Sequence, residues 1–180
     1  MANIKCCIVL LQLLALISVA LAGAAITSTH LQLYMHETVA ASPWSPATVV
    51  PVARGTTPMP GDPNTRFGDM YVIDNPLTEG PSATSPAVGR AQGFYLFVAQ
   101  HELAAMHYLS LVFTAGRYNG SYIVIQGRDT IPAKVRELPV VGGVGRFRGA
   151  TGYGLLRTHS FDSTTKNAVL KIDMYLNNMK

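Results

Sequence analysis

The sequence contains little cysteine and few charged residues. Only 13% of its 180 residues are charged, and its two cysteines, Cys6 and Cys7, lie next to each other near the N-terminus. No thiol stands beyond residue 7, which excludes a cysteine-ligated zinc site or a thiol nucleophile from the rest of the chain. The formal net charge is +4, and the basic residues are interleaved with apolar residues instead of forming the dense stripe that binds nucleic acid. We expect no nucleic-acid partner.

The motifs of several enzyme classes are also missing. The five histidines show no metal-ligand spacing such as H-E-x-x-H, so we expect no metal site and interpret them as structural. No serine stands in a G-x-S-x-G context, so a hydrolase triad has no support. Gly143, Gly145 and Gly149 miss the dinucleotide fingerprint by one residue, and the glycines that follow disfavour the helix that a phosphate loop needs. We interpret Arg136 to Gly154 as two strands joined by a glycine-rich turn.

One long apolar run occurs, at the N-terminus. Lys5 precedes a run from Cys6 to Ala25 that is interrupted only by Gln12 and Ser18 and ends in "ALAGAA". The small residues offer A-x-A cleavage sites, and no basic stop-transfer cluster follows, so we predict a signal peptide over residues 1–24, cleaved near residues 22–25. A membrane anchor is the alternative, since about 20 apolar residues can span a bilayer. We expect a secreted protein without membrane attachment after cleavage, with one disulfide-free domain over residues 25–180.

The remainder consists of short apolar or alternating runs separated by turn residues, a pattern typical of all-β proteins. Strands are predicted over residues 31–38, 48–50, 67–74, 88–100, 106–114, 121–126, 135–141, 153–161 and 168–176. Asn75-Pro76 is expected to end the 67–74 strand, residues 43–63 to be mostly irregular because they hold six prolines, and residues 101–106 to be the one helix candidate. Asn119-Gly120 predicts a hairpin turn. An antiparallel barrel or sandwich fits this pattern, and we favour an eight-stranded barrel with a ligand cavity at one mouth.

Four motifs resemble those of a known family. They are "FGDMYVIDNPLTEGP" (residues 67–81), "RAQGFY" (90–95), "LVFTAGRYNGS" (111–121) and "RELPVVGGVGRFR" (136–148). In order and spacing they resemble the plant dirigent family, and with "LYMHET" and "AVLKIDMYL" the resemblance covers essentially the whole mature chain. It implies an eight-stranded antiparallel β-barrel of the calycin or allene oxide cyclase-like type, secreted to the apoplast and assembled as a homodimer or homotrimer.

The resemblance also implies a function. Dirigent proteins direct the coupling of two phenoxy radicals, typically from coniferyl alcohol, to one stereoisomer of a lignan; a separate laccase or peroxidase makes the radicals, and no cofactor is needed. An apolar cavity can orient two aromatic partners, and an acid can assist ring closure of the quinone methides that coupling produces. Two alternatives stay open. The protein could be an isomerase or cyclase acting alone on a phenolic quinone methide, or a cell-wall or defence module that only binds phenolics or glycans.

The family pattern points to three catalytic candidates. Asp129 in "GRDT" and Arg136 in "RELP" match functional positions of the family, and Glu37 in "MHET" stands where lignan-forming members have aspartate. An acid among them would protonate the quinone oxygen. The competing interpretations are a surface-turn Asp129 paired with Arg128 and an exposed Glu37 at a strand end.

Two aromatic residues are the expected substrate contacts. Tyr95 matches a cavity tyrosine of the family, and Phe97 stands where lignan-forming members have a second tyrosine. Phe97, the Arg128 that replaces an alanine, and the missing family cysteine pair together indicate a branch whose substrate the resemblance does not establish. The sequon Asn119-Gly120-Ser121 predicts glycosylation at Asn119 in a secreted protein, unless Asn119 is required for the tight turn.

Overall fold

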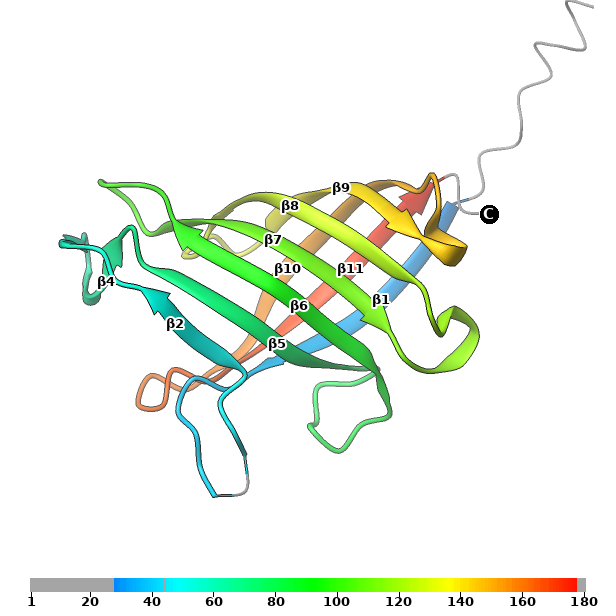
Figure 1. Ribbon diagram of the computed structural model, residues 1–180, viewed down its shortest axis with the longest axis horizontal. Helices are drawn as coiled ribbons and strands as arrows, with labels where there is room; N and C mark the ends of the chain where they lie inside the picture. Colours follow the sequence, from blue (N-terminus) through cyan, green and yellow to red (C-terminus); the bar gives the residue numbers. More distant parts are fainter. Residues whose placement is uncertain (1–27, 44, 178–180) are drawn as a thin grey trace, which may run out of the picture.

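The structure is a computed structural model that describes residues 28–43 and 45–177 (Figure 1). The predicted signal peptide, residues 1–24, lies outside the described residues. Within the described part of the chain, no helix has the length and apolar character needed to cross a membrane. The secondary structure consists of strands and two single-turn 3₁₀ helices, η1 (Gly116–Tyr118) and η2 (Gly145–Phe147).

The strands follow one another with short connections. Their bounds are β1 (Ser28–Glu37), β2 (Val49–Ala53), β3 (Thr57–Met59), β4 (Asp62–Phe67), β5 (Met70–Thr78), β6 (Ala87–Phe97), β7 (Ala104–Phe113), β8 (Tyr122–Thr130), β9 (Arg136–Val144), β10 (Thr151–Phe161) and β11 (Ala168–Asn177).

Eight of these strands close into an antiparallel barrel, as the sequence predicted. The order around the barrel is β1-β11-β10-β9-β8-β7-β6-β5, and β5 returns to β1 through the pairs Tyr34–Thr78 and Met35–Leu77. β2 pairs with the first residues of β5, from Met70 to Ile73, while β3 and β4 form a separate hairpin (Figure 1). Closure satisfies the backbone groups that an open sheet would leave unpaired at its edges.

The structure corrects the prediction that Asn75-Pro76 ends a strand. β5 continues through both residues to Thr78, and Pro76 pairs with Arg90 of β6. On its other side β5 pairs with β2 only as far as Ile73 and with β1 only from Leu77 onward. The N–H that proline lacks therefore removes no ladder hydrogen bond, which is the situation in which a strand tolerates proline.

One further prediction is wrong, and another is incomplete. Residues 101–106 contain no helix, because Ala104 already begins β7 and pairs with Thr130 of β8; so short a helix has little stability of its own. The segment from Pro43 to Pro63, expected to be mostly irregular, contains β2, β3 and the start of β4. Pro51, Pro58 and Pro63 lie on these edge strands, where the missing donor can face solvent, and the other three prolines lie in the turns and loops around them.

The turn between β7 and β8 also differs from expectation. The positive φ angles belong to Gly116 (66°) and Gly120 (76°), whereas Asn119 has φ −48°. The connection is therefore the 3₁₀ turn η1 followed by a glycine, and Asn119 is not required for positive φ.

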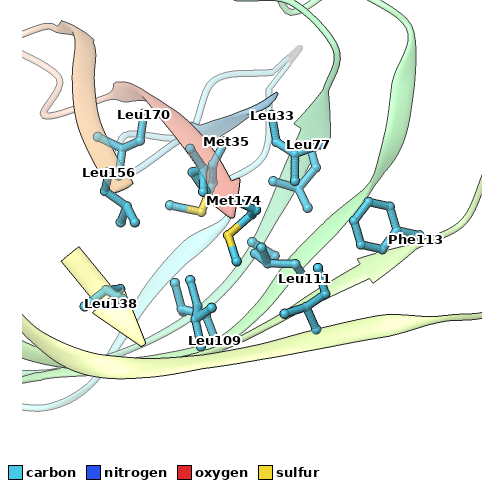
Figure 2. Packing of buried hydrophobic residues seen from close by; sticks show 14 of the residues in the cluster. Leu33, Met35, Leu77, Leu109, Leu111, Phe113, Leu138, Leu156, Leu170 and Met174 are labelled. Carbon is cyan, nitrogen blue, oxygen red and sulfur yellow. The ribbon is translucent and has the colours of Figure 1, made fainter. Parts of the chain in front are cut away.

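The interior is filled by side chains that alternate inward along each strand. Leu33 and Met35 of β1 meet Leu109 and Leu111 of β7 and Met174 of β11 in one buried cluster (Figure 2). This alternation is the pattern of strands with one face toward a core. These buried side chains fill the middle of the barrel, and other residues occupy its two ends.

One end of the barrel, here called the packed end, is closed by Phe113, Tyr118 and Phe147. The ring of Phe147 is fully buried and lies 5.1 Å from the ring of Phe113 and 4.8 Å from that of Tyr118. Gly143 is needed for this arrangement, because a Cβ there would lie 2.5 Å from Cβ of Phe147. The stretch from Arg136 to Gly154 is thus two strands joined by a glycine-rich turn, as predicted, and the turn places the aromatic plug.

Candidate functional site

A cavity of about 670 Å³ opens at the opposite end of the barrel. Its volume lies in the range of roughly 300–1,000 Å³ that holds small organic ligands. We call this end the cavity end. The residues that line the cavity are Glu37, Gly61, Asp62, Pro63, Asn64, Tyr95, Phe97, Leu103, His107, Asp129, Ile131, Arg136, Thr158, Phe161, Lys166, Ala168 and Leu170.

The polar residues reach the cavity because they occupy inward positions at strand ends. Glu37 is the last residue of β1, two positions after the buried Met35. Arg136 is the first residue of β9, two positions before the buried Leu138. Asp129 lies near the end of β8, and because consecutive antiparallel strands reverse direction, the end of β8 meets the start of β9.

Asp129 and Arg136 form a buried ion pair in the cavity wall. Asp129 is 1% exposed and Arg136 5%, and Nη1 of Arg136 lies 3.6 Å from Oδ2 of Asp129. Burial raises the pKa of Asp129, and the charge of Arg136 opposes that rise. Arg128 instead pairs with Glu102 and donates to Oγ1 of Thr130 at 2.6 Å. The surface-turn interpretation of Asp129 is therefore wrong.

Glu37 lines the same cavity and is half-buried. Nδ2 of Asn75 donates to Oε1 of Glu37 at 3.4 Å, and Asn75 is held by a 2.6 Å hydrogen bond from Thr48. Burial raises the pKa of Glu37 to about 7, with the charge of Arg136 lowering it and that of Asp129 raising it further. The exposed strand-end interpretation is wrong, and near neutral pH this carboxyl group is available in both protonation states.

Tyr95 and Phe97 project from β6 into the cavity, as their places in the family pattern implied. The ring of Tyr95 stacks on Tyr71 at 5.0 Å, and Phe97 meets Tyr95 edge-on at 5.8 Å. Burial raises the pKa of the Tyr95 hydroxyl, so that hydroxyl stays protonated and can donate a hydrogen bond. The two side chains form an aromatic wall with one polar group.

The structure adds one residue that sequence reasoning missed. His107 was interpreted as structural, but it lines the cavity, stacks on Tyr95 at 5.2 Å and places Nε2 3.5 Å from Oδ2 of Asp129. Its position two residues before Leu109, in the inward alternation of β7, was the available signal. Burial, followed by the charge of Arg136, lowers the pKa of His107 to about 4, so the imidazole is uncharged at neutral pH.

The remaining sequence predictions concern metal binding and glycosylation. No group of three or more potential ligands that could hold a metal ion occurs among the described residues. Asn119 is exposed in the turn after η1, while the hydroxyl of Ser121 accepts a hydrogen bond from the Arg146 amide at 3.1 Å. Glycosylation of Asn119 stays a prediction.

The cavity combines two carboxyl groups in different electrostatic surroundings. Asp129 pairs with Arg136, whose charge opposes the rise that burial causes in the pKa of Asp129, while Glu37 takes part in no ion pair among the described residues and has its pKa raised to about 7. Such a separation assigns the roles of acid and base to two carboxyl groups in one site. Within an apolar wall, the pair can donate a proton at one point of a ligand and accept one at another.

Comparisons with known proteins agree with the fold and identify the family. The chain matches the Dirigent-like protein family over residues 28–177. It is 45% identical to Dirigent protein 1 of Arabidopsis thaliana over 132 residues, which cover 73% of this chain and 69% of that protein. It is 36% identical to Pterocarpan synthase 1 of Glycine max over 151 residues, 83% and 78% of the two chains. A solved pterocarpan synthase dirigent protein superposes with a TM-score of 0.76 at 35% identity, covering 86% and 90%. The chain belongs to the dirigent family.

Proposed function

We propose that this dirigent protein controls the stereochemistry of ring closure of a phenolic quinone methide by proton transfer from its own side chains. The observation that carries the proposal is the cavity that both Glu37 and Asp129 line, in which Asp129 is paired with Arg136 and the pKa of Glu37 is raised to about 7. An acid and a base held in one apolar cavity suit a redox-neutral cyclisation. The reaction requires no redox cofactor.

The proposed step balances without any co-reactant. Protonated Glu37 donates its proton to the quinone oxygen, which makes the exocyclic carbon more electrophilic. A hydroxyl group of the same ligand forms a C–O bond to that carbon and gives its proton to Asp129. The ring becomes a phenol again, and proton exchange with solvent returns a proton to Glu37 and removes one from Asp129.

Stereocontrol follows from the way the cavity holds the ligand. The edge-on rings of Tyr95 and Phe97, with Tyr71 stacked on Tyr95, can fix the plane of an aromatic ligand, and the Tyr95 hydroxyl can hold one of its oxygens. Attack then occurs on the face that points toward Asp129. Orientation of reacting groups in this manner is a large part of what a binding site contributes to a reaction.

Relatives support the choice of reaction. Two pterocarpan synthase structures match over 86% of this chain, with TM-scores of 0.76 and 0.75. Both are named as pterocarpan synthase dirigent proteins. By this likeness we propose a cyclase as the first candidate for the present chain.

The second candidate is stereoselective coupling of two phenoxy radicals, such as those of coniferyl alcohol, supplied by an external laccase or peroxidase. The volume of the cavity, about 670 Å³, favours it, because a pair of one-ring phenols fits within the usual range of ligand pockets. The quinone methides so formed would meet the same acid and base.

Under either candidate we propose secretion to the apoplast and assembly as a homodimer or homotrimer, on the grounds of the N-terminal apolar run and the family.

The test uses two substrates with one readout. A quinone methide with a tethered hydroxyl group is generated photochemically with and without the protein, and coniferyl alcohol is oxidised in parallel with a one-electron oxidant. Products are separated on a chiral column, with Asp129→Ala as the control. An enantiomeric excess in the first reaction supports the cyclase, and one confined to the second reaction supports radical coupling. Racemic products in both, with saturable ligand binding, would contradict both and indicate a binding module.

A further inference from the structure

We propose that His107 is a positioning residue: its imidazole donates the Nε2 hydrogen to Oδ2 of Asp129 and, with Arg136, holds that carboxylate in place as the base. The role of the base rests on the proposed function. The contact itself does not, because it is a property of the folded barrel.

The strand register fixes the imidazole ring. Tyr71, Tyr95 and His107 are directly paired across β5, β6 and β7, and their rings stack at 5.0 and 5.2 Å with interplanar angles of 21° and 17°. Directly opposed residues on one face of a sheet are close enough for such contacts. The plane of the His107 ring is therefore determined by an aromatic row that begins two strands away.

The next strand leaves room for the ring to reach Asp129. His107 is paired with Gly127 of β8, which has no side chain, and Asp129 lies two residues further along the same strand. Diagonal neighbours of this kind are within reach of long side chains. Oδ2 of Asp129 then has two neighbours, Nε2 of His107 at 3.5 Å and Nη1 of Arg136 at 3.6 Å. Both distances are longer than the roughly 2.7–3.2 Å of an ordinary N–H···O hydrogen bond.

The charges decide which nitrogen carries the hydrogen. The ionisable groups that face His107 are Asp129 from β8, Arg136 from β9 and Tyr95 from β6, with Glu37 of β1 across the cavity. A neutral imidazole has one N–H group, and an ionised carboxylate only accepts hydrogen bonds. The nitrogen that faces Asp129 must therefore be the donor, and Nδ1 is left as an acceptor.

Burial of an unpaired Nδ1 on His107 lowers the stability of the fold unless the histidine serves the site. Nδ1 of His107 is buried and has no hydrogen-bond partner among the described residues, whereas polar atoms buried for structural reasons are nearly always paired. An apolar side chain would fill the same space without the penalty. What His107 supplies that a leucine or phenylalanine would not is the hydrogen directed at Asp129.

The experiment compares four proteins by infrared titration of the Asp129 carboxyl group, assigned by subtracting the spectrum of Asp129→Asn. His107→Phe keeps an aromatic ring against Tyr95 but lacks the donor, and His107→Gln keeps a donor without the ring. Tyr108→Phe is the matched control, since Tyr108 is the next residue of β7 and is 40% exposed on the outside of the barrel.

We expect the midpoint of the Asp129 titration to rise by about one pH unit in His107→Phe, the size associated with one lost hydrogen bond to a charged group. His107→Gln should restore at least half of that change, and Tyr108→Phe should match the wild type. A folded His107→Phe protein with an unchanged midpoint would overturn the proposal. So would a His107→Gln protein shifted as far as His107→Phe, because packing alone would then explain the effect.

A second measurement does not depend on any variant folding. Nitrogen-15 NMR of the wild-type protein at neutral pH reports the His107 tautomer, and the proposal requires hydrogen on Nε2; hydrogen on Nδ1 contradicts it. Neither readout uses a substrate. A barrel that fails to cyclise any quinone methide but shows the expected titration and tautomer would overturn the proposed function and leave the role of His107 intact.

Discussion

The two ends of the barrel are built from the same strands but differ in the side chains that point inward. β7 carries His107 at the cavity end and Phe113 at the packed end. At the packed end the inward side chains are aromatic or aliphatic and contact one another. At the cavity end aromatic and aliphatic side chains share the wall with polar ones, of which His107, Asp129 and Arg136 are buried and incompletely paired.

The two ends also differ in their buried polar atoms that lack hydrogen-bond partners. Nδ1 of His107, Oδ1 of Asp129 and Nε of Arg136 are buried without partners, and Arg66 contributes the only other such atom among the described residues. Each one lowers stability unless a ligand or water satisfies it. The packed end therefore holds the barrel together, and the cavity end gives up stability for a reactive arrangement.

The largest change in the free energy of unfolding is expected for Phe147→Ala at the packed end. Removing a fully buried ring that contacts Phe113 and Tyr118 is expected to lower the free energy of unfolding by about 3–5 kcal/mol. Urea denaturation measures this change. The molecules that remain folded should keep the ligand affinity of the wild type, and a loss below about 1 kcal/mol would contradict the role of the plug.

The second prediction concerns pH and the cavity end. Glu37 has its pKa raised from 4.5 to about 7, so the folded protein binds this proton more strongly than the unfolded chain does. Its contribution to stability is complete below about pH 4.5 and is lost as pH rises to about 7. The loss is on the order of 2 kcal/mol, allowing for solvent access to a half-buried group.

His107 acts in the opposite direction. Its pKa is lowered from 6.5 to about 4, so its contribution is complete above about pH 6.5 and is lost as pH falls toward 4. The two effects partly cancel in the wild type. In Glu37→Gln, the free energy of unfolding should therefore rise with pH between 4 and 6.5 more steeply than in the wild type. Equal pH profiles for the two proteins would show that Glu37 is not perturbed.

A third prediction tests the glycine-rich turn with a matched pair. Gly143→Ala places Cβ 2.5 Å from Cβ of Phe147, whereas a Cβ at Gly142 meets nothing within 4 Å. We expect Gly143→Ala to lower the free energy of unfolding by about 1–3 kcal/mol. Gly142→Ala should change it by no more than about 0.5 kcal/mol. Equal losses in the two variants would mean that the backbone, and not the plug, requires glycine.

The smallest effect is expected for Phe97→Tyr at the cavity end. The side chains have nearly the same volume, so stability should change by less than about 1.5 kcal/mol. The new hydroxyl adds a donor to the aromatic wall beside Tyr95 and should tighten the binding of a two-oxygen phenol several-fold. Isothermal titration with a phenol and its methyl ether measures the change, and equal affinity gains for both ligands would exclude a hydrogen bond.

The alternating pattern of the sequence predicted an antiparallel barrel or sandwich and favoured the barrel, and the family pattern pointed to Glu37, Tyr95, Phe97, Asp129 and Arg136, which all line one cavity. Other features depend on which strands become neighbours. β5 runs through Pro76 because no strand pairs with it on that side, and a linear pattern does not contain that fact. His107 is recognised only when Tyr95, Gly127 and Asp129 of the adjoining strands surround it.

The enantiomeric excess of the ring-closed product is the most direct test of the difference between the two ends. It would be measured for wild type, Asp129→Asn and Phe147→Leu at equal concentrations of folded protein. The account predicts an excess with wild type and Phe147→Leu, and racemic product with Asp129→Asn formed about 10²-fold more slowly. A folded Asp129→Asn protein that retains the full excess and rate would contradict it.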